Sequence, residues 1–359
     1  KVVTKVISGT SKNDSIYEYA LGTAYDVTTL GTPSTTSLVR NGSENSNQSG
    51  LSDIQGMCFN ATGTKLYVVD KFHKRIIQYA LSTAFLITSL SYEKELSVEA
   101  QDLGPVSIKF NPTGSKMYMI GNTGNPLAAP AVVAGNVNEY DVSSAFDIST
   151  AVYGRRLSVA AQDANMKDLF FNEVARGADS PGKLMFMLGE DGIDINEYLL
   201  TSAYDVSTAT FVDAHSVGSE DDKPRSIQFN ADGSKVYTTG QTGNEINVYT
   251  LVTANDISTT QAVQSTTSFA TNTIEPRGWS FSADGYKMFV VGTGGTLCID
   301  GGDDEETVKF HTVRTRNVIK MYEGNTYVFD VSDNNMTGSD FKFSTTSGGT
   351  KSGGVEYTT

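Results

Sequence analysis

Short hydrophobic runs alternate with polar turns along most of the chain, and two patterns of positions recur. The first pattern is a Phe, a polar turn with Gly and Lys, and then an apolar run, as in Phe59-Asn-Ala-Thr-Gly63-Thr-Lys65-Leu-Tyr67. Its anchors are 51, 61, 58 and 52 residues apart, at Phe59, Phe110, Phe171, Phe229 and Phe281. The third copy is stretched, since its Gly is Gly182. Such runs between turn residues predict β-strands.

The second pattern is a Tyr, then Thr-Ala or Ser-Ala, then an aromatic residue and Asp. Its first copy runs from Tyr19 to Asp26, and the others begin at Tyr79, Tyr140, Tyr198 and Tyr249. Asp side chains hold strand corners by accepting backbone N–H bonds, so we interpret the repeated Asp as architecture. Leu86 replaces it in the second copy, where the corner must be made differently, and Asn255 replaces the aromatic residue in the last.

The two patterns interleave five times, and repeats of this length predict four-stranded propeller blades. We therefore expect an all-β fold, a five-bladed β-propeller over residues 1–294. Its closing blade is composite and pairs 1–26 with 278–291, which removes a free sheet edge. Within a blade we expect strands such as 65–69 and 79–81, and a fourth strand near 96–98.

The repeat stops after Gly295, and residues 295–359 predict a separate module. This segment has an acidic turn at 300–306 and then strand-like runs at 308–313, 318–322, 326–330 and 341–344. It predicts a small, β-sandwich-like C-terminal segment, and it stops in what looks like the middle of a module. A segment of about sixty residues is marginally stable alone. We therefore expect it to pack on the propeller, on a partner or on further chain.

Composition narrows the class of protein. The 359 residues carry a formal charge of −14, which disfavours nucleic-acid binding because phosphate recognition needs clustered Lys and Arg. We also expect no membrane insertion, since no apolar run approaches the length of a membrane span. Two Cys and three His leave little for a disulfide framework or a metal cage. The chain begins with Lys1, which predicts a trimmed or mature form.

Acidic residues precede each Phe anchor by six to eight positions, and in a propeller those loops converge at one mouth of the central channel. They are Asp53, Asp102, Asp163, Asp221 with Asp222, and Glu275. A ring of carboxylates there would bind Ca²⁺ or a polyhydroxylated ligand. The alternative is that each carboxylate closes its own loop by accepting N–H bonds, copied from blade to blade. Lys167, Arg225 and Arg277 lie in the same loops and would neutralise part of the ring.

The longest connection between strands runs from Asn122 to Asn136 and is apolar. It contains Pro126, Leu127, Pro130 and Val132. Long loops on a rigid scaffold often carry binding function, so this loop is a candidate partner contact. The alternative is an insertion that packs over its own blade.

No motif for catalysis stands out, so we expect no enzymatic activity. The chain has no Gly-x-Ser-x-Gly elbow, no His-Glu-x-x-His and no phosphate-binding loop. The three histidines, His73, His215 and His311, share no metal-ligand spacing and predict surface positions. We interpret Cys58 as a small buried residue beside a core Phe, and Trp279 as core instead of a sugar-stacking platform.

The blade pattern resembles β-propellers of the NHL and lactonase-like group, and is more similar to propeller repeats in structural proteins of marine bacteriophages, including cyanophages. The run Tyr322-Glu-Gly-Asn-Thr-Tyr-Val-Phe-Asp-Val-Ser332, with 341–345, looks like a short β-module that recurs in such virion proteins. The family's usual His-Pro before the last Phe run is Ser339-Asp340 here, so no role of that His is carried over.

The resemblance implies a non-enzymatic virion component: a fibre, capsid-decorating or tail-associated propeller at the virion surface. Its expected partners are other virion proteins or copies of itself, and a host cell-surface glycan. The alternative is a secreted bacterial propeller that binds carbohydrate with Ca²⁺, or acts like a lactonase, through the acidic ring. The first interpretation needs no cofactor, whereas the second needs Ca²⁺.

Overall fold

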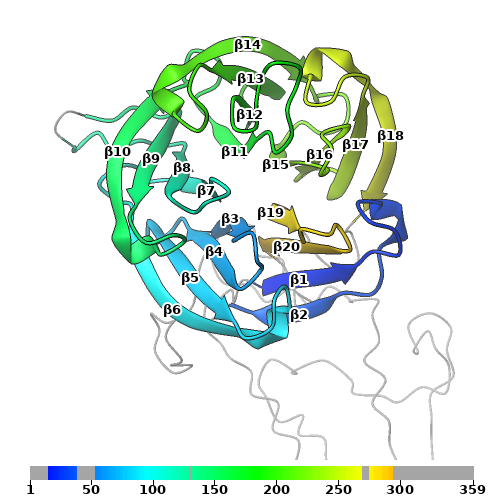
Figure 1. The fold of residues 1–359 in the computed structure, drawn as a ribbon, viewed down its shortest axis with the longest axis horizontal. Coiled ribbons are helices and arrows are strands. Elements are labelled where there is room, and N and C mark those ends of the chain that lie inside the picture. Colours follow the sequence, from blue (N-terminus) through cyan, green and yellow to red (C-terminus); the bar gives the residue numbers. More distant parts are fainter. Residues whose placement is uncertain (1–14, 39–52, 129–130, 269–274, 294–359) are drawn as a thin grey trace, which may run out of the picture. The chain divides into compact units, whose positions relative to one another are not determined.

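Twenty strands form five antiparallel sheets that surround a central axis in a computed structural model (Figure 1). The structure describes residues 15–38, 53–128, 131–268 and 275–293. The five-bladed propeller predicted from the repeat is thereby confirmed. The predicted C-terminal module, 295–359, lies outside the described residues, as do Cys298 and His311.

Each blade has four strands, numbered from the axis outward. Blade I contains β3 (Ile54–Phe59), β4 (Lys65–Asp70), β5 (Arg75–Leu81) and β6 (Leu90–Ser97). Blade II contains β7 (Pro105–Phe110), β8 (Lys116–Gly121), β9 (Asn136–Val142) and β10 (Ala151–Ser158). Blade III contains β11 (Met166–Phe171), β12 (Leu184–Gly189), β13 (Asp194–Leu200) and β14 (Ala209–Ser216). Blade IV contains β15 (Pro224–Phe229), β16 (Lys235–Gly240), β17 (Glu245–Leu251) and β18 (Thr260–Ser268).

Blade V is composite, as the sequence predicts. Its order is β19 (Glu275–Phe281), β20 (Lys287–Thr293), β1 (Ser15–Ala20) and β2 (Ser34–Ser37). The pairing of β1 with β20 sets Ile16 opposite Val291 and Ala20 opposite Lys287. Two segments far apart in the sequence thus close the ring by backbone hydrogen bonds, which leaves no open edge between them.

The outer strands begin earlier than the sequence suggests. A short 3-10 turn directly precedes each of them. These turns are η1 (Val27–Thr29), η2 (Ile87–Ser89), η3 (Ile148–Thr150), η4 (Val206–Thr208) and η5 (Ile257–Thr259). The strand expected near 96–98 is therefore β6, which ends before Val98. Val98 instead donates its N–H to Lys74 O at 2.9 Å.

The repeated Asp residues are architectural, as expected. Asp26, Asp147, Asp205 and Asp256 each accept the N–H two residues further on and so cap a 3-10 turn. Leu86 makes no side-chain cap, and there Ser89 Oγ donates to Leu86 O at 2.7 Å. The other four corners have the same hydroxyl bond, made there by a Thr, so the second corner keeps this bond and lacks only the carboxylate cap.

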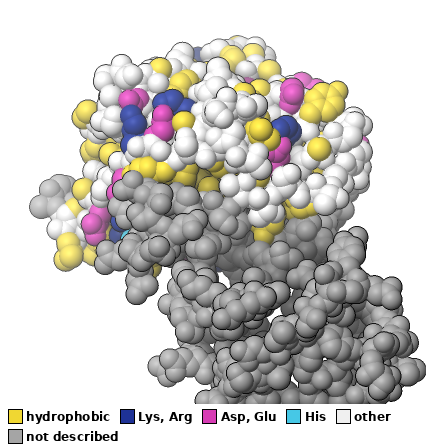
Figure 2. Space-filling model, turned by 90° about the horizontal axis from the view of Figure 1, so that it is seen from below, with side chains coloured by type: hydrophobic (Ala, Val, Ile, Leu, Met, Phe, Trp, Pro, Cys, Tyr) yellow, Lys and Arg dark blue, Asp and Glu magenta, His cyan; other side chains and the backbone are white. Residues whose placement is uncertain are grey.

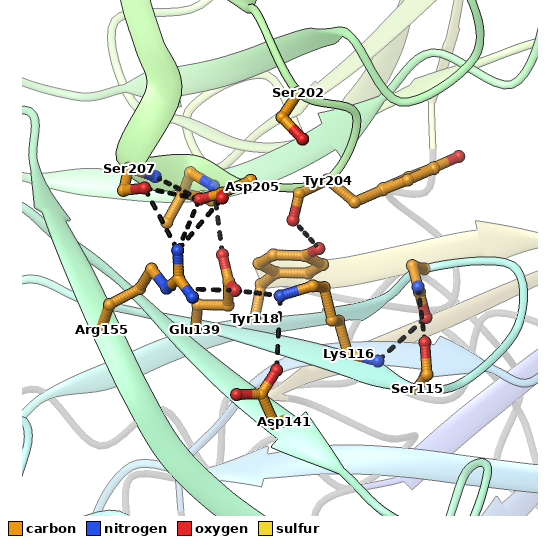
Figure 3. A network of polar contacts seen from close by, with 12 residues as sticks. Ser115, Lys116, Tyr118, Glu139, Asp141, Arg155, Ser202, Tyr204, Asp205 and Ser207 are labelled. Atoms are coloured by element: carbon orange, nitrogen blue, oxygen red, sulfur yellow. Dashed lines mark hydrogen bonds and ion pairs between the residues drawn. The ribbon is translucent and has the colours of Figure 1, made fainter.

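Adjacent blades are joined by side chains that cross from one blade to the 3-10 turn of the next. Glu139 of blade II accepts the N–H of Val206 at 3.1 Å, and Tyr118 donates to Tyr204 O at 2.7 Å (Figure 3). Arg155 of the outer strand also reaches Asp205, at 2.9 Å. The first two bonds lie in the blade wall, where low exposure makes an unpaired group costly.

Where the sequence lacks this tyrosine, a cation makes the same contact. Tyr67 and Tyr237 occupy the Tyr118 position and donate to the carbonyls of Phe146 and Tyr25. In blade V the position is Phe289, and Lys287 Nζ donates to Phe85 O at 2.7 Å. In blade III it is Phe186, and Arg176 Nη1 donates to Asn255 O at 3.1 Å. Every blade therefore holds the corner of its neighbour.

The outer wall of the propeller mixes charges of both signs. Figure 2 shows Lys and Arg side chains beside Asp and Glu, separated by scattered hydrophobic side chains. Such intermixed charge is typical of an ordinary solvated surface. Among the described residues, no helix is long and apolar enough to cross a membrane.

Candidate functional site

The channel has two mouths, which we call the loop mouth and the Phe mouth. The inner strands begin at the loop mouth, where the predicted acidic residues lie, and end at the Phe mouth with the Phe anchors. Each mouth carries a different set of side chains.

At the loop mouth, the carboxylates of three blades accept hydrogen bonds from their own loops. Asp102 is fully buried and accepts the N–H groups of Gly104 at 2.7 Å and Gly124 at 2.9 Å. Asp163 and Asp221 repeat this arrangement, accepting from Gly192 and Gly243, both at 2.8 Å. Each carboxylate thus joins the loop before the inner strand to the connection between the second and third strands.

The remaining predicted members of the ring differ from these three. Asp53 has a positive φ of 67° and accepts a hydrogen bond from Gln55 Nε2. Asp222 accepts a hydrogen bond from the hydroxyl of Thr242. Glu275 begins β19, and its side chain lies outside the described part of the chain.

The predicted neutralising cations meet a carboxylate that the sequence did not single out. Glu190 accepts Lys167 Nζ at 2.8 Å and Arg225 Nη1 at 2.7 Å. These cations hold the pKa of the Glu190 carboxyl below its usual value, against the opposing effect of burial. Burial, with Arg225 nearby, lowers the pKa of Lys167. Arg277 Nη1 donates to Gln55 Oε1 at 3.4 Å.

This geometry does not suit Ca²⁺, which needs six to eight converging oxygens with free lone pairs. The oxygens of Asp102, Asp163 and Asp221 point at backbone N–H groups, and Lys167 and Arg225 stand between blades at the same mouth. Within the described residues, no group of three or more His, Cys, Asp or Glu side chains could hold a metal ion. The acidic ring as a binding site stays a prediction.

Between the mouths, one carboxylate links the inner strands of three blades. The positions two residues after Ile54 and its equivalents face the axis, and they are Gly56, Ser107, Asp168, Ser226 and Gly278. Asp168 accepts both flanking serine hydroxyls, each at 2.5 Å, and Lys109 Nζ lies 3.6 Å from it. On the other side, a Cβ on Gly278 would come within 2.8 Å of Gly56 Cα. Asp168 and the close backbone approach thus link the inner strands at this level.

The Phe mouth opens into a pocket of about 440 Å³ lined by twenty residues. Nine of them are aromatic, and they come from all five blades: Tyr25, Phe59, Phe85, Phe110, Phe146, Phe170, Tyr204, Phe229 and Phe281. Amide and hydroxyl side chains also line it, including Gln228 and Ser280. A cavity that combines aromatic side chains with converging polar groups has the lining that small-molecule sites use.

The aromatic residues of the second pattern are held in this pocket by a strained backbone. Tyr25, Phe85, Phe146 and Tyr204 have φ between 53° and 61°, a region that bulky residues rarely adopt. Each ring lies against the turn glycine of its own blade, as Phe85 does on Gly63, whose φ is 67°. A Cβ at Gly63 would lie 2.2 Å from the Phe85 ring, so only glycine fits. The left-handed φ recurs in all five blades, since Asn255 has a φ of 58° at this position of blade IV, and in four of them it places a ring at the rim of the pocket.

The stretched copy of blade III adds the charged residue. Phe171 and Gly182 bound an insertion that brings Glu173 and Pro181 to the pocket wall. The Glu173 side chain is accessible from the pocket. Desolvation by the surrounding protein nevertheless raises the pKa of its carboxyl, and the charge of Lys109 acts in the opposite direction. Glu173 also raises the pKa of Tyr204, which burial brings to about 12.

The candidate partner loop lies on blade II and is partly folded against it. Asn125 pairs with Val132, which is buried, whereas Leu127 is 89% exposed. Asn122 Nδ2 donates to Asn165 Oδ1 at 3.1 Å, Pro126 is exposed, and Pro130 lies outside the described residues. The base of the loop thus packs against its own blade, whereas Leu127 is exposed to solvent. A contact with a partner stays a prediction.

Several single residues take the positions that the sequence predicts. Cys58 is buried, and burial raises the pKa of its thiol to about 12. Trp279 is fully buried between Tyr237 and Phe281 and so offers no stacking face to a sugar. His73 differs from a plain surface residue, because its Nδ1 lies 2.7 Å from the buried Asp70 carboxylate.

Sequence reasoning missed the Phe mouth. In the sequence, the Phe anchors have the pattern of core residues, and the stretched third copy carries no motif that predicts a site. One sequence feature points to this site. Blade III has an insertion between Phe171 and Gly182, at the turn that follows the Phe anchor in every blade.

Comparison with known proteins places few constraints on this chain. No family model matches it, and no curated protein matches it either. A structure from Bacteroides uniformis, of a protein proposed to be a 6-phosphogluconolactonase, aligns with 14% identity and a TM-score of 0.40 over 66% of this chain and 61% of its own. A protein of the same proposed activity from Bacteroides fragilis aligns with 12% identity and a TM-score of 0.42, covering 79% of this chain and 88% of its own.

A periplasmic gluconolactonase from Pseudomonas aeruginosa aligns with 15% identity and a TM-score of 0.36 over 60% of this chain. The present chain spans 53% of the length of that protein. At such identities the names of these proteins do not transfer to this chain.

Proposed function

We propose that this protein is a carbohydrate-binding propeller whose ligand occupies the pocket at the Phe mouth. The observation that carries the proposal is the aromatic lining, nine rings from five blades around one cavity of about 440 Å³. The C–H face of a pyranose ring packs on an aromatic face, and its hydroxyl groups bond to amides and hydroxyls. Gln228, whose Nε2 donates to Trp279 O at 3.2 Å, is one such amide in the pocket wall.

We favour binding over catalysis for this pocket. Most glycoside hydrolases use a pair of carboxyl groups that flank the scissile bond. Glu173 is the single carboxylate among the described residues that line the pocket. A lactonase-like activity remains the alternative, and incubation with sugar lactones, followed by product analysis, distinguishes it from binding.

The proposal is tested by replacing one rim aromatic with a residue of similar volume but without a ring. Phe146→Leu keeps an apolar side chain in the pocket and removes the stacking face. We expect it to weaken saccharide affinity by roughly fivefold, in line with about 1 kcal/mol for an aromatic contact. Isothermal titration against saccharides identified on a glycan array provides the measurement.

Phe211→Leu is the matched control, because Phe211 is 44% exposed on the outer strand β14. It should leave affinity unchanged, and melting curves should show both variants folded. Equal affinity of the Phe146 variant and the unchanged protein, or no saccharide binding at all, would overturn the proposal.

A role on a virion is the finer proposal, and its support is the sequence resemblance of the blades and of the segment at 322–345. A glycan-binding pocket suits a host-attachment protein at a particle surface. Electron microscopy with labelled antibody tests it: regular copies on a particle would support the role, and a freely soluble monomer would contradict it.

A further inference from the structure

We propose, building on the proposed function, that the saccharide bound at the Phe mouth carries a free amine and that Glu173 binds this amine. The inference narrows the proposed ligand of that pocket from saccharides in general to saccharides that carry a basic amine. It stands on three features of the described residues: the charge of the pocket, the anchoring of the insertion, and the aromatic rim.

The first feature is charge. Glu173 is the single acidic or basic side chain among the described residues that line the pocket; Lys109, whose charge acts to lower the pKa of Glu173, is not part of that lining. The Glu173 carboxylate makes no hydrogen bond or ion pair with another described residue, in contrast to Glu190 at the loop mouth. An exposed carboxylate in a cavity wall offers a ligand cation a charge-assisted bond, which is about twice as strong as a neutral one.

The second feature is that the insertion is fixed in place. Asn172 accepts the N–H of Leu184 at 2.9 Å and donates to Val174 O at 2.7 Å, which holds the backbone on both sides of Glu173. Arg176 then ties the insertion to Glu197 of β13, with 2.5 Å between Nη1 and Oε1. The position of Glu173 is therefore built by the fold.

The neighbouring blade completes this anchor. Asn255 Nδ2 donates to Val174 O at 3.2 Å, and Arg176 donates to Asn255 O. Asn255 stands where the other blades have an aromatic ring, and its amide makes the contact that a ring could not make. The loss of one ring and the gain of one carboxylate thus occur together, at the junction of blades III and IV.

The third feature is the aromatic rim. Glu173 lines the same pocket as Tyr25 of blade V and Tyr204 of blade III, and its charge adds to the effect of burial in raising the pKa of both phenols. A protonated amine beside the carboxylate would also face aromatic rings, and cation–π attraction adds to its binding. A neutral N-acetyl group at the same position gains neither interaction.

The test compares two ligands that differ only in this group: a β-1,4-linked glucosamine oligosaccharide and the N-acetylated oligosaccharide of equal length. Titration calorimetry is carried out at a pH where the sugar amine is protonated. We expect the amine form to bind at least about tenfold more tightly, consistent with a charge-assisted bond. The preference should decrease as salt is raised, since exposed charges are screened.

Glu173→Gln keeps the shape of the side chain and removes its charge, so it should bring the two affinities to parity. Glu99→Gln, an exposed residue on a loop of the opposite mouth, is the matched control and should leave the preference intact. Equal affinities for the two ligands, or an unchanged preference in the Glu173 variant, would overturn the inference while leaving saccharide binding in place. Absence of binding to both ligands would also overturn the inference if a saccharide identified on the array still bound, whereas absence of binding to every saccharide would refute the proposed function.

Discussion

The two mouths of the channel use carboxylates in opposite ways. At the loop mouth, Asp102, Asp163 and Asp221 are buried, and each accepts backbone N–H bonds from two connections of its own blade. At the Phe mouth, Glu173 is exposed in the wall of the pocket and is not bonded to another described residue. Carboxylates of the first kind hold the fold together, and one of the second kind is available to a ligand.

The difference separates what a repeat preserves from what it varies. The loop-mouth Asp recurs because every blade has the same two connections to join. Glu173 occurs once, in an insertion of blade III, opposite a position where blade IV has lost its ring. In this propeller, the departures from the repeat mark the candidate site more clearly than the repeat itself does.

The largest effect that we predict is on the carboxylate between the mouths. Asp168→Ala would leave the hydroxyls of Ser107 and Ser226 without their acceptor and would remove the carboxylate that lies 3.6 Å from the Lys109 ammonium. Breaking a buried pair in this way costs about 3–5 kcal/mol. Chemical denaturation of the purified protein measures the loss as a lower midpoint.

Asp141→Ala is the control for this substitution, because the Asp141 side chain is 63% exposed and pairs with Lys116 at the surface. It should change the free energy of unfolding by less than about 0.5 kcal/mol. Similar stability of the two variants would show that Asp168 does not hold the blades together.

The next largest effect concerns the loop mouth. Asp102→Asn would place an amide NH₂ opposite the backbone N–H of Gly104 or Gly124, each of which now donates to the carboxylate. That buried N–H would then have no acceptor. We expect the free energy of unfolding to fall by about 1–3 kcal/mol. Thermal melting with and without Ca²⁺ should give the same loss, because both oxygens of Asp102 already accept hydrogen bonds within the loop.

The same melting experiment tests the calcium ring. If Ca²⁺ raised the melting temperature of the unchanged protein, and Asp102→Asn with Asp163→Asn abolished that rise, then the loop mouth would be a metal site. Glu99→Gln again provides a reference, since its side chain is exposed on the same face of the blade connections.

Most of the fold could be predicted from the sequence, because the pattern of each blade strand occurs five times along the chain. The Phe anchors give the ends of the inner strands, the turn glycines give the hairpins, and the offset between the two patterns gives the composite blade. The 3-10 turns were not predicted, since three residues leave no periodic signal. Their Asp caps were nevertheless correctly interpreted as architecture.

The candidate site could be predicted only in part. The spacing of the acidic residues predicts that they lie at one mouth of the channel. It does not show whether their oxygens face the channel or the backbone of their own loops. The direction of a side chain in a loop depends on contacts such as those of Asp102 with Gly124, 22 positions away. Nor could spacing show that Tyr25 and Tyr204, on different blades, lie around one pocket with Glu173.

The smallest predicted effect is the pH dependence of ligand binding at the Phe mouth. The pKa of Glu173 is raised, mainly by desolvation, so its carboxylate takes up a proton at a higher pH than an ordinary Glu. Over the pH range in which the sugar amine stays protonated, affinity for an amine-bearing saccharide should therefore be highest above this raised pKa and decline as the pH falls through it. The loss is about twofold at the pKa itself and about tenfold one unit below it. The N-acetylated ligand should show no such decline, and neither ligand should show it in Glu173→Gln. Titration calorimetry over a pH series provides the measurement, and a decline that persists in that variant would assign the titrating group to another residue.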